Sequence, residues 1–313
     1  MSDYAFVAEK ARKAFDAVAK LEAAIERSPE DRVLQVNLAA TRRYAEQTRT
    51  EMDQLAAFKR MEVCQYRLIS ERSNGYSLEH VAKSLLSYQQ LFSQIYDAVN
   101  NGKKSRVGVG REAEIASALE FGFTFSGSLG VMLLARGERD SIAGRLDAPI
   151  EALYQVLEIK NRDDVRDMAQ RLGRAVIKRV HDWSAANVKG GFSADNSWRR
   201  SDGRQLGQMV HSGQMERIVE YIDAATDEKT LSVSIKGTLV GADLVSRTFH
   251  IKPLSGESRT GQISQGMIFE DGLILNRLYQ AEITVTEAYY YATEQKTQIN
   301  VLNQLTPIDM QPT

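Results

Sequence analysis

The chain has 313 residues, 43% hydrophobic content and a formal net charge of −1. This length and apolar content are sufficient for a substantial core, in roughly two domains of ordinary size. A net charge near zero disfavours a protein that binds polyanions over its whole surface. Because no run of about 18 consecutive apolar residues occurs and residues 1–6 lack the basic and apolar pattern of an export signal, we expect a cytoplasmic protein without membrane association.

The N-terminal region has helical hydrophobic spacing. Apolar residues recur three and four positions apart at Phe15, Val18, Leu21 and Ile25. Ser28 and Pro29 then indicate a turn into a second helix. Its apolar row continues from Pro29 through Leu55 to Leu68, over about forty residues. A third helix is expected between Ser77 and Gly102. Residues 1–102 are therefore predicted to form a long helical hairpin or coiled coil with a bracing helix.

The predicted second helix is much longer than the first. An amphipathic helix without a partner is unstable in water, so the excess length has to be covered by another element or a second copy of the chain. We expect a homo-oligomer, with Leu55 in its apolar seam, and expect Leu55→Lys to weaken association.

Residues 103–228 have a mixed pattern. An extended or hairpin segment is expected at 121–135 and another at 188–198, with two helices between them that are capped at Asp147 and Asn161. A turn at 201–203 and a short helix around 215–222 follow. The order β-α-α-β-α predicts an α+β domain.

The C-terminal region alternates apolar and polar residues, as strands do. Leu231, Val233 and Ile235 share one face of an extended segment, and Ile283 and Val285 repeat the pattern. Five strands are expected, at about 230–242, 246–253, 258–264, 279–291 and 295–304. Residues 229–305 are thus predicted to form a small antiparallel β-barrel of OB or SH3-like type, followed by a tail at 306–313.

The charge is unevenly distributed along the chain. Residues 1–102 carry 14 basic and 14 acidic side chains, residues 103–204 carry 18 and 14, and residues 205–313 carry 8 and 13. The basic middle region contains two clusters that suit an anion, because guanidinium and ammonium groups neutralise phosphate and an aromatic ring can stack on a base. The residues concerned are Lys103, Lys104, Arg106, Arg111, Trp198, Arg199, Arg200 and Arg204.

Evidence for catalysis in the sequence is weak. Glu158 and Lys160 match the Glu-x-Lys of a magnesium-dependent nuclease, with Asp140 or Asp147 as a second carboxylate, but the pattern falls at a predicted helix end. The glycines at 108 and 110 match a dinucleotide-binding pattern, but a basic segment precedes them where a strand is required. No histidines have the spacing of metal ligands on one helix face. We therefore expect no metal site and no cofactor.

These observations favour a non-enzymatic binding or assembly protein. It is expected to self-associate through its N-terminal helices and to present the basic central region to an anionic partner, either nucleic acid or a nucleotide. The alternatives are a magnesium-dependent nuclease that uses Glu158 and Lys160, and a purely structural scaffold.

Overall fold

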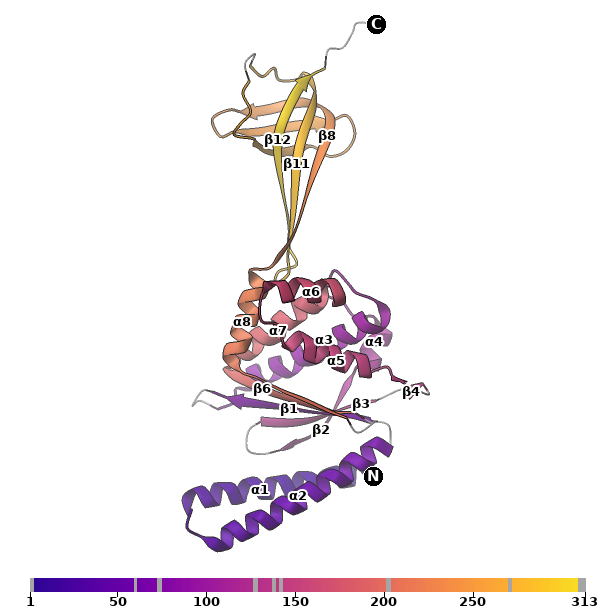
Figure 1. Ribbon diagram of the computed structural model, residues 1–313, viewed down its shortest axis with the longest axis vertical. Coiled ribbons are helices and arrows are strands. Elements are labelled where there is room, and N and C mark those ends of the chain that lie inside the picture. Colours follow the sequence, from indigo (N-terminus) through magenta and orange to yellow (C-terminus); the bar gives the residue numbers. More distant parts are fainter. Residues whose placement is uncertain are drawn as a thin grey trace. The chain divides into compact units, whose positions relative to one another are not determined.

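The computed structural model describes residues 3–58, 61–71, 75–125, 129–136, 139–140, 143–200, 204–269 and 272–308. The chain divides into two compact units, Met1–Ala225 and Thr226–Thr313. Figure 1 shows the helices and strands of each unit. Within the described ranges, no helix is long and apolar enough to cross a lipid bilayer.

The first unit begins with the expected helical hairpin. Helix α1 spans Asp3–Arg27 and α2 spans Arg32–Phe58. The carboxylate of Asp31 accepts hydrogen bonds from the backbone N–H groups of Val33 at 2.9 Å and Leu34 at 3.2 Å, which fixes the start of α2.

The predicted forty-residue helix is wrong in its last third, because residues 61–70 form a strand, β1 (Met61–Ser70). This strand lies at the centre of a five-stranded antiparallel sheet with the order β2-β3-β1-β6-β7. The other strands of the sheet are β2 (Leu119–Phe125), β3 (Leu129–Arg136), β6 (Phe192–Arg199) and β7 (Gln205–Val210). Hydrogen bonding of β1 to β3 on one edge and to β6 on the other favours a strand more strongly than the helical spacing of its apolar residues favours a helix. The expected boundary at residue 102 consequently lies inside the first unit.

The two faces of this sheet have different cover. On one face, α1 and α2 pack their apolar residues against Val63 of β1 and against Met132 and Leu134 of β3. On the other face lies a layer of helices (Figure 1). These helices are α3 (Leu78–Asn101), α4 (Arg111–Ala116), α5 (Asp147–Leu157), α6 (Arg162–Leu172), α7 (Arg174–Gly190) and α8 (Ser212–Asp223). A two-stranded ribbon of β4 (Arg139–Asp140) and β5 (Ala143–Gly144) precedes α5.

Several local predictions for this unit are confirmed. Residues 121–125 and 129–135 lie in the paired strands β2 and β3, and α8 contains the expected helical segment. The Asn161 side chain caps α6 by accepting from the backbone N–H groups of Asp163 and Asp164, both at 2.9 Å. The turn expected at 201–203 lies outside the described residues.

The second unit is a closed ring sheet of five strands, as the alternating pattern predicts. The strands are β8 (Thr226–Asp243), β9 (Thr248–Pro253), β10 (Arg259–Ile263), β11 (Leu278–Tyr290) and β12 (Lys296–Pro307). Their order around the ring is β10-β12-β11-β8-β9, with β10 and β12 parallel and every other pair antiparallel. A Cβ atom on Gly261 would lie 2.2 Å from the carbonyl oxygen of Asn300, so the close approach of β10 and β12 requires glycine there.

Candidate functional site

The basic segment at 103–111 is an ordered loop fixed to α3. Asp97 of α3 accepts hydrogen bonds from the Lys104 ammonium and from the Gly110 N–H at 3.3 Å. Burial raises the pKa of Asp97, but the hydrogen bonds from Lys104, Asn101 and Gly110 outweigh that effect and leave its pKa below the usual value. Gly173, at φ 93°, allows the backbone of Lys104 to pass within 2.5 Å of where a Cβ atom would lie.

The four cations of this loop are therefore not equivalent. Lys104 is paired with Asp97, and Lys103 donates a 2.9 Å hydrogen bond to the carbonyl of Gln170. Arg106 and Arg111 are exposed, and no ion pair is found for either among the described residues. The loop thus retains two cations for an anionic partner.

The second predicted cluster does not form a binding surface around Trp198. This side chain is fully buried, its ring lies 4.8 Å from that of Phe92, and its indole N–H donates a 2.8 Å hydrogen bond to the Tyr88 hydroxyl. Strand β6 alternates, so Trp198 faces the helical layer while Arg199 points to the opposite face of the sheet. The expectation that a base stacks on Trp198 is wrong, because no face of the ring is exposed.

The arginines beside Trp198 are also partly engaged. The Arg200 side chain is only 6% exposed and pairs with Asp147 at 2.6 Å and Glu151 at 3.1 Å. Arg200 was expected to contact an anionic partner, but it instead pairs with two carboxylates at the start of α5. Arg199 is half-buried, and Arg204 is exposed.

Trp198 belongs to a buried polar network that the sequence did not reveal. The Tyr88 hydroxyl donates to Asn196 Oδ1 at 3.0 Å and lies 3.3 Å from Cys64 Sγ. Trp183 Nε1 donates to the Tyr66 hydroxyl at 2.9 Å. Burial raises the pKa of the Cys64 thiol to about 12 and that of Tyr66 to about 12, so both groups are protonated at neutral pH. The network joins the sheet to the helical layer and has no open side, which gives it a structural role.

Glu158 and Lys160 lie in the turn between two helices. Glu158 follows the last residue of α5, and the backbone N–H of Lys160 donates to Asp164 at 2.8 Å. Of the two carboxylates considered as partners, Asp147 is paired with Arg200, and the Asp140 side chain is outside the described set. The described residues contain no cluster of three or more His, Cys, Asp or Glu side chains placed to hold a metal ion. The nuclease alternative has no support from this geometry.

Helix α2 carries two separate apolar rows. Ala45, Thr48 and Met52 face inward and are buried. A second row of apolar residues, which we call the α2 stripe, lies about a third of a turn away and faces solvent. It consists of Val33 (69% exposed), Val36 (68%), Ala40 and Tyr44 (47%). Leu55, which was expected in an intermolecular seam, instead packs against the core between the hairpin and the sheet.

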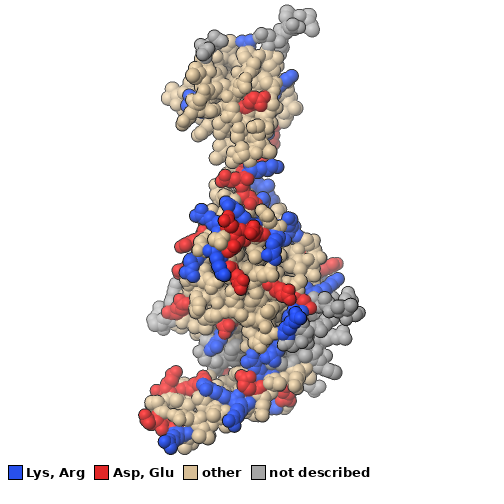
Figure 2. Space-filling model, in the orientation of Figure 1, with Lys and Arg blue, Asp and Glu red and all other residues tan. Residues whose placement is uncertain are grey.

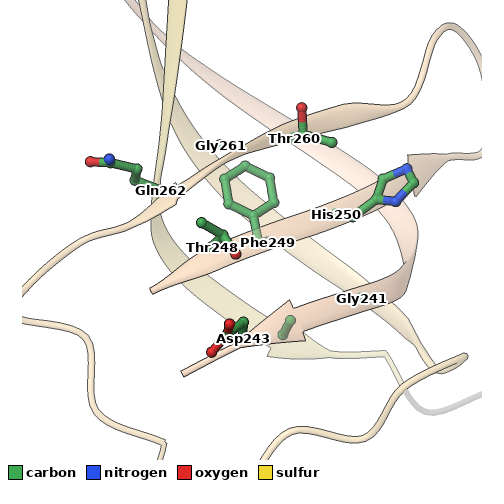
Figure 3. Close-up of a pocket in the computed structure, with 9 residues that line it drawn as sticks. Gly241, Asp243, Thr248, Phe249, His250, Thr260, Gly261 and Gln262 are labelled. Carbon is green, nitrogen blue, oxygen red and sulfur yellow. The ribbon is translucent and has the colours of Figure 1, made fainter. Parts of the chain in front are cut away.

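The outer surface of the ring sheet has one broad hollow of about 630 Å³ over β8, β9 and β10. Figure 3 shows side chains from all three strands around it. Two glycines, Gly241 and Gly261, are among the residues that line it. The hollow also contains Asp243, Thr248, His250, Thr260 and Gln262.

The hollow is rigid at one end. The Asp243 carboxylate accepts from the backbone N–H groups of Val245 at 2.8 Å and Ser246 at 3.1 Å, so it fixes the β8–β9 turn. The hydrogen bonds from Ser246 and Val245 lower the pKa of Asp243. None of these residues was among the predicted sites. The alternation of residues 248–252 placed Thr248 and His250 on an outer face, which is the only signal that the sequence offered.

Charged side chains of both signs are interspersed on the first unit, whereas few appear on the second unit in the view of Figure 2. Residues 226–313 carry 7 basic and 10 acidic side chains. The lining of the hollow contains one carboxylate, Asp243, and no lysine or arginine, and apolar atoms make up most of its exposed surface.

Comparison with family models, curated proteins and solved structures finds no match to this chain.

Proposed function

We propose that this protein is a non-enzymatic binding and assembly protein that self-associates through the α2 stripe. The observation that carries this proposal is the second apolar row of α2, which is exposed at Val33 and Val36 and, among the described residues, has a contact with α1 only at Tyr44, where Lys10 lies over the ring. Burial of a large aliphatic side chain stabilises by roughly 1.5–3 kcal/mol, so Val33 and Val36 provide a driving force for association on both partners.

The flanking charges favour a second copy of this chain as the occupant. Arg32 and Glu46 lie on the same flank of the stripe, and the midpoint between them falls at residue 39, as does the approximate midpoint of Val33 and Tyr44. Two antiparallel α2 helices related by a two-fold axis near this point place Val33 opposite Tyr44 and each Arg32 beside Glu46 of the second copy. The stripe is complementary to itself in apolar contacts and in charge.

Sedimentation velocity over a range of concentrations tests this proposal. The wild-type chain should form dimers at micromolar concentration, and Val36→Lys should weaken dimerisation at least tenfold because it places an unpaired charge in the seam. Val245→Lys is a matched control, since Val245 is 97% exposed on the second unit and should leave dimerisation unchanged.

A charge exchange identifies the antiparallel arrangement. Arg32→Glu and Glu46→Arg should each weaken the dimer, and the double variant should recover most of the loss. A wild-type mass of one chain at every concentration would refute self-association. If the double variant loses as much dimerisation free energy as the two single variants together, the antiparallel pairing is contradicted.

The second unit supports a second candidate function, the binding of a neutral polar chain such as an oligosaccharide. We propose that the ring sheet is a small barrel of OB type, since a five-stranded ring with its third and fifth strands parallel favours that arrangement over an SH3-like one. The faces of the second and third strands of such barrels bind oligonucleotides and oligosaccharides, and the hollow lies on β9 and β10. The fold alone gives no function, but hydroxyl, amide and imidazole groups without a cation suit sugar hydroxyls better than phosphates.

Calorimetric titration with a panel of neutral hexasaccharides and with the oligonucleotide dT12 separates these ligands. We expect saccharide binding that is lost in the His250→Ala, Gln262→Ala double variant and retained in Lys252→Ala. Tighter binding of dT12 than of every saccharide would contradict the proposal.

The anionic partner of the central region is a separate proposal that now depends on Arg106 and Arg111. Its test is binding to duplex DNA at several salt concentrations. The Arg106→Glu, Arg111→Glu double variant should bind every DNA sequence more weakly. The slope of the logarithm of the binding constant against the logarithm of the salt concentration should also decrease in magnitude by about two. Unchanged binding in that double variant would remove the loop as the anion site.

A further inference from the structure

A cleft of about 230 Å³ lies between the helical hairpin and the five-stranded sheet. It exists because the apolar character of the sheet changes along β1. Val63 packs with α1 and α2, but Gln65 and Arg67, which follow on the same face, are polar and half-buried. The hairpin and sheet therefore enclose space beyond Val63 instead of closing on it.

The walls of this cleft have two kinds of surface. Phe15 and Val18 of α1 and Met132 of β3 provide an apolar side. Arg49 of α2 and Arg67 of β1 bring guanidinium groups to the same cleft. A ligand that fills it therefore needs an apolar part and a part that accepts hydrogen bonds from arginine.

Arg49 is only weakly paired with a carboxylate. The one carboxylate in the wall, Glu22, is already paired with Arg42 at 2.8 Å. The side chain of Arg49 is only 22% exposed, and its sole ion pair within the described structure is a long contact of 3.8 Å with Glu46. Its Nε is buried and has no hydrogen-bond partner in the described structure. Arg49 is therefore a weakly paired cation in the wall of the cleft, and its terminal nitrogens are the donors that an anion in the cleft would reach.

We propose that this cleft binds a small carboxylate with a short apolar tail. The carboxylate accepts hydrogen bonds from the two terminal nitrogens of Arg49, a two-pronged geometry that arginine offers to planar anions. The tail lies against Phe15, Val18 and Met132. At about 30 Å³ of liquid volume per water molecule, the cleft holds about eight non-hydrogen atoms, which is the size of hexanoate.

The test uses hexanoate, 1-hexanol and inorganic phosphate as probes, with binding to the full chain followed by NMR titration. The three probes separate the contributions of charge and tail. Hexanoate should bind at least tenfold more tightly than either of the other two. Equal binding of hexanoate and hexanol would overturn the role of Arg49, and equal binding of hexanoate and phosphate would overturn the role of the apolar wall.

Two variants locate the site. Arg49→Gln should reduce hexanoate affinity to that of hexanol, whereas Arg43→Gln, at an exposed position of the same helix, should not change it. Ala19→Phe should fill the cleft and abolish binding of both organic probes, with circular dichroism confirming the fold. Unchanged affinity in Arg49→Gln or in folded Ala19→Phe would overturn the proposal, as would absence of hexanoate binding to the wild type. Val36→Lys should retain hexanoate binding, so this outcome is independent of self-association.

Discussion

The two faces of the five-stranded sheet differ in how completely they are covered. Cys64, Tyr66 and Leu68 of β1 face the helical layer and are all buried. On the opposite face Val63 is buried under the hairpin, but Gln65 and Arg67 are only half-buried. Polar groups on the covered face mostly bond to one another, and each face has a buried nitrogen without a partner among the described contacts, Asn196 Nδ2 on the covered face and Arg49 Nε above the open face. Complete cover thus produces a structural network, and incomplete cover produces a cleft.

Trp198→Ala on the covered face should give the largest effect. Loss of a fully buried indole creates a cavity, and removal of large aromatic side chains typically costs about 3–5 kcal/mol. Denaturant unfolding monitored by circular dichroism measures the change. Ser197→Ala, on the other face of the same strand, is the control and should remain within about 0.5 kcal/mol of wild type. Similar losses in both variants would contradict the asymmetry of the faces.

Tyr88→Phe should have an intermediate effect. The ring remains, but Trp198 Nε1 loses its acceptor and Asn196 Oδ1 loses a donor. A buried group left unsatisfied costs about 1–3 kcal/mol. The same unfolding measurement checks this value, and Tyr290→Phe at an exposed position serves as a comparison. A stability equal to that of wild type would show that the hydroxyl network contributes nothing.

High pH should weaken the covered face. The folded-state pKa of Cys64 is raised from 9.0 to about 12, so above pH 9 the unfolded chain loses a proton that the folded chain retains. The contribution of this thiol to the free energy of unfolding should therefore be constant below pH 9 and fall between pH 9 and 12, by up to about 1.4 kcal/mol per pH unit. Unfolding of Cys64→Ala between pH 8 and 10.5 should show a shallower decline than wild type. Parallel curves for the two proteins would contradict the assignment.

Arg49→Met should give the smallest change in stability. This substitution keeps an apolar stem and removes a charge whose Nε is desolvated without a partner in the described structure. We expect the free energy of unfolding to remain unchanged or to rise by up to about 1 kcal/mol. A loss above 1 kcal/mol would show that the guanidinium stabilises the fold, and the contrast between the two faces would then disappear.

Prediction from the sequence succeeded where local periodicity and burial agree. Strands β8 to β12 alternate with a period of two because one face of each lines a single core, and their positions follow from that pattern. The cap at Asn161 and the helix α8 depend on nearby residues and were also predicted. The candidate site was predicted less well. Arg106 and Arg111 are exposed as expected, but the hollow on the ring sheet is assembled from three strands and has no short motif.

The sequence by itself determined the α+β class, the N-terminal hairpin and the strands of the C-terminal ring sheet, because each depends on the spacing of apolar residues along one segment. Tertiary structure alone decided that residues 61–70 are a central strand, since both of their hydrogen-bonding edges are paired with strands distant in the chain. It also decided that Trp198 is a core residue, that Leu55 packs inward and that Val36 faces solvent. An aromatic residue beside arginines, or a valine on a helix, has the same local sequence pattern whether its side chain is buried or exposed. Its role is fixed by which surface another element covers.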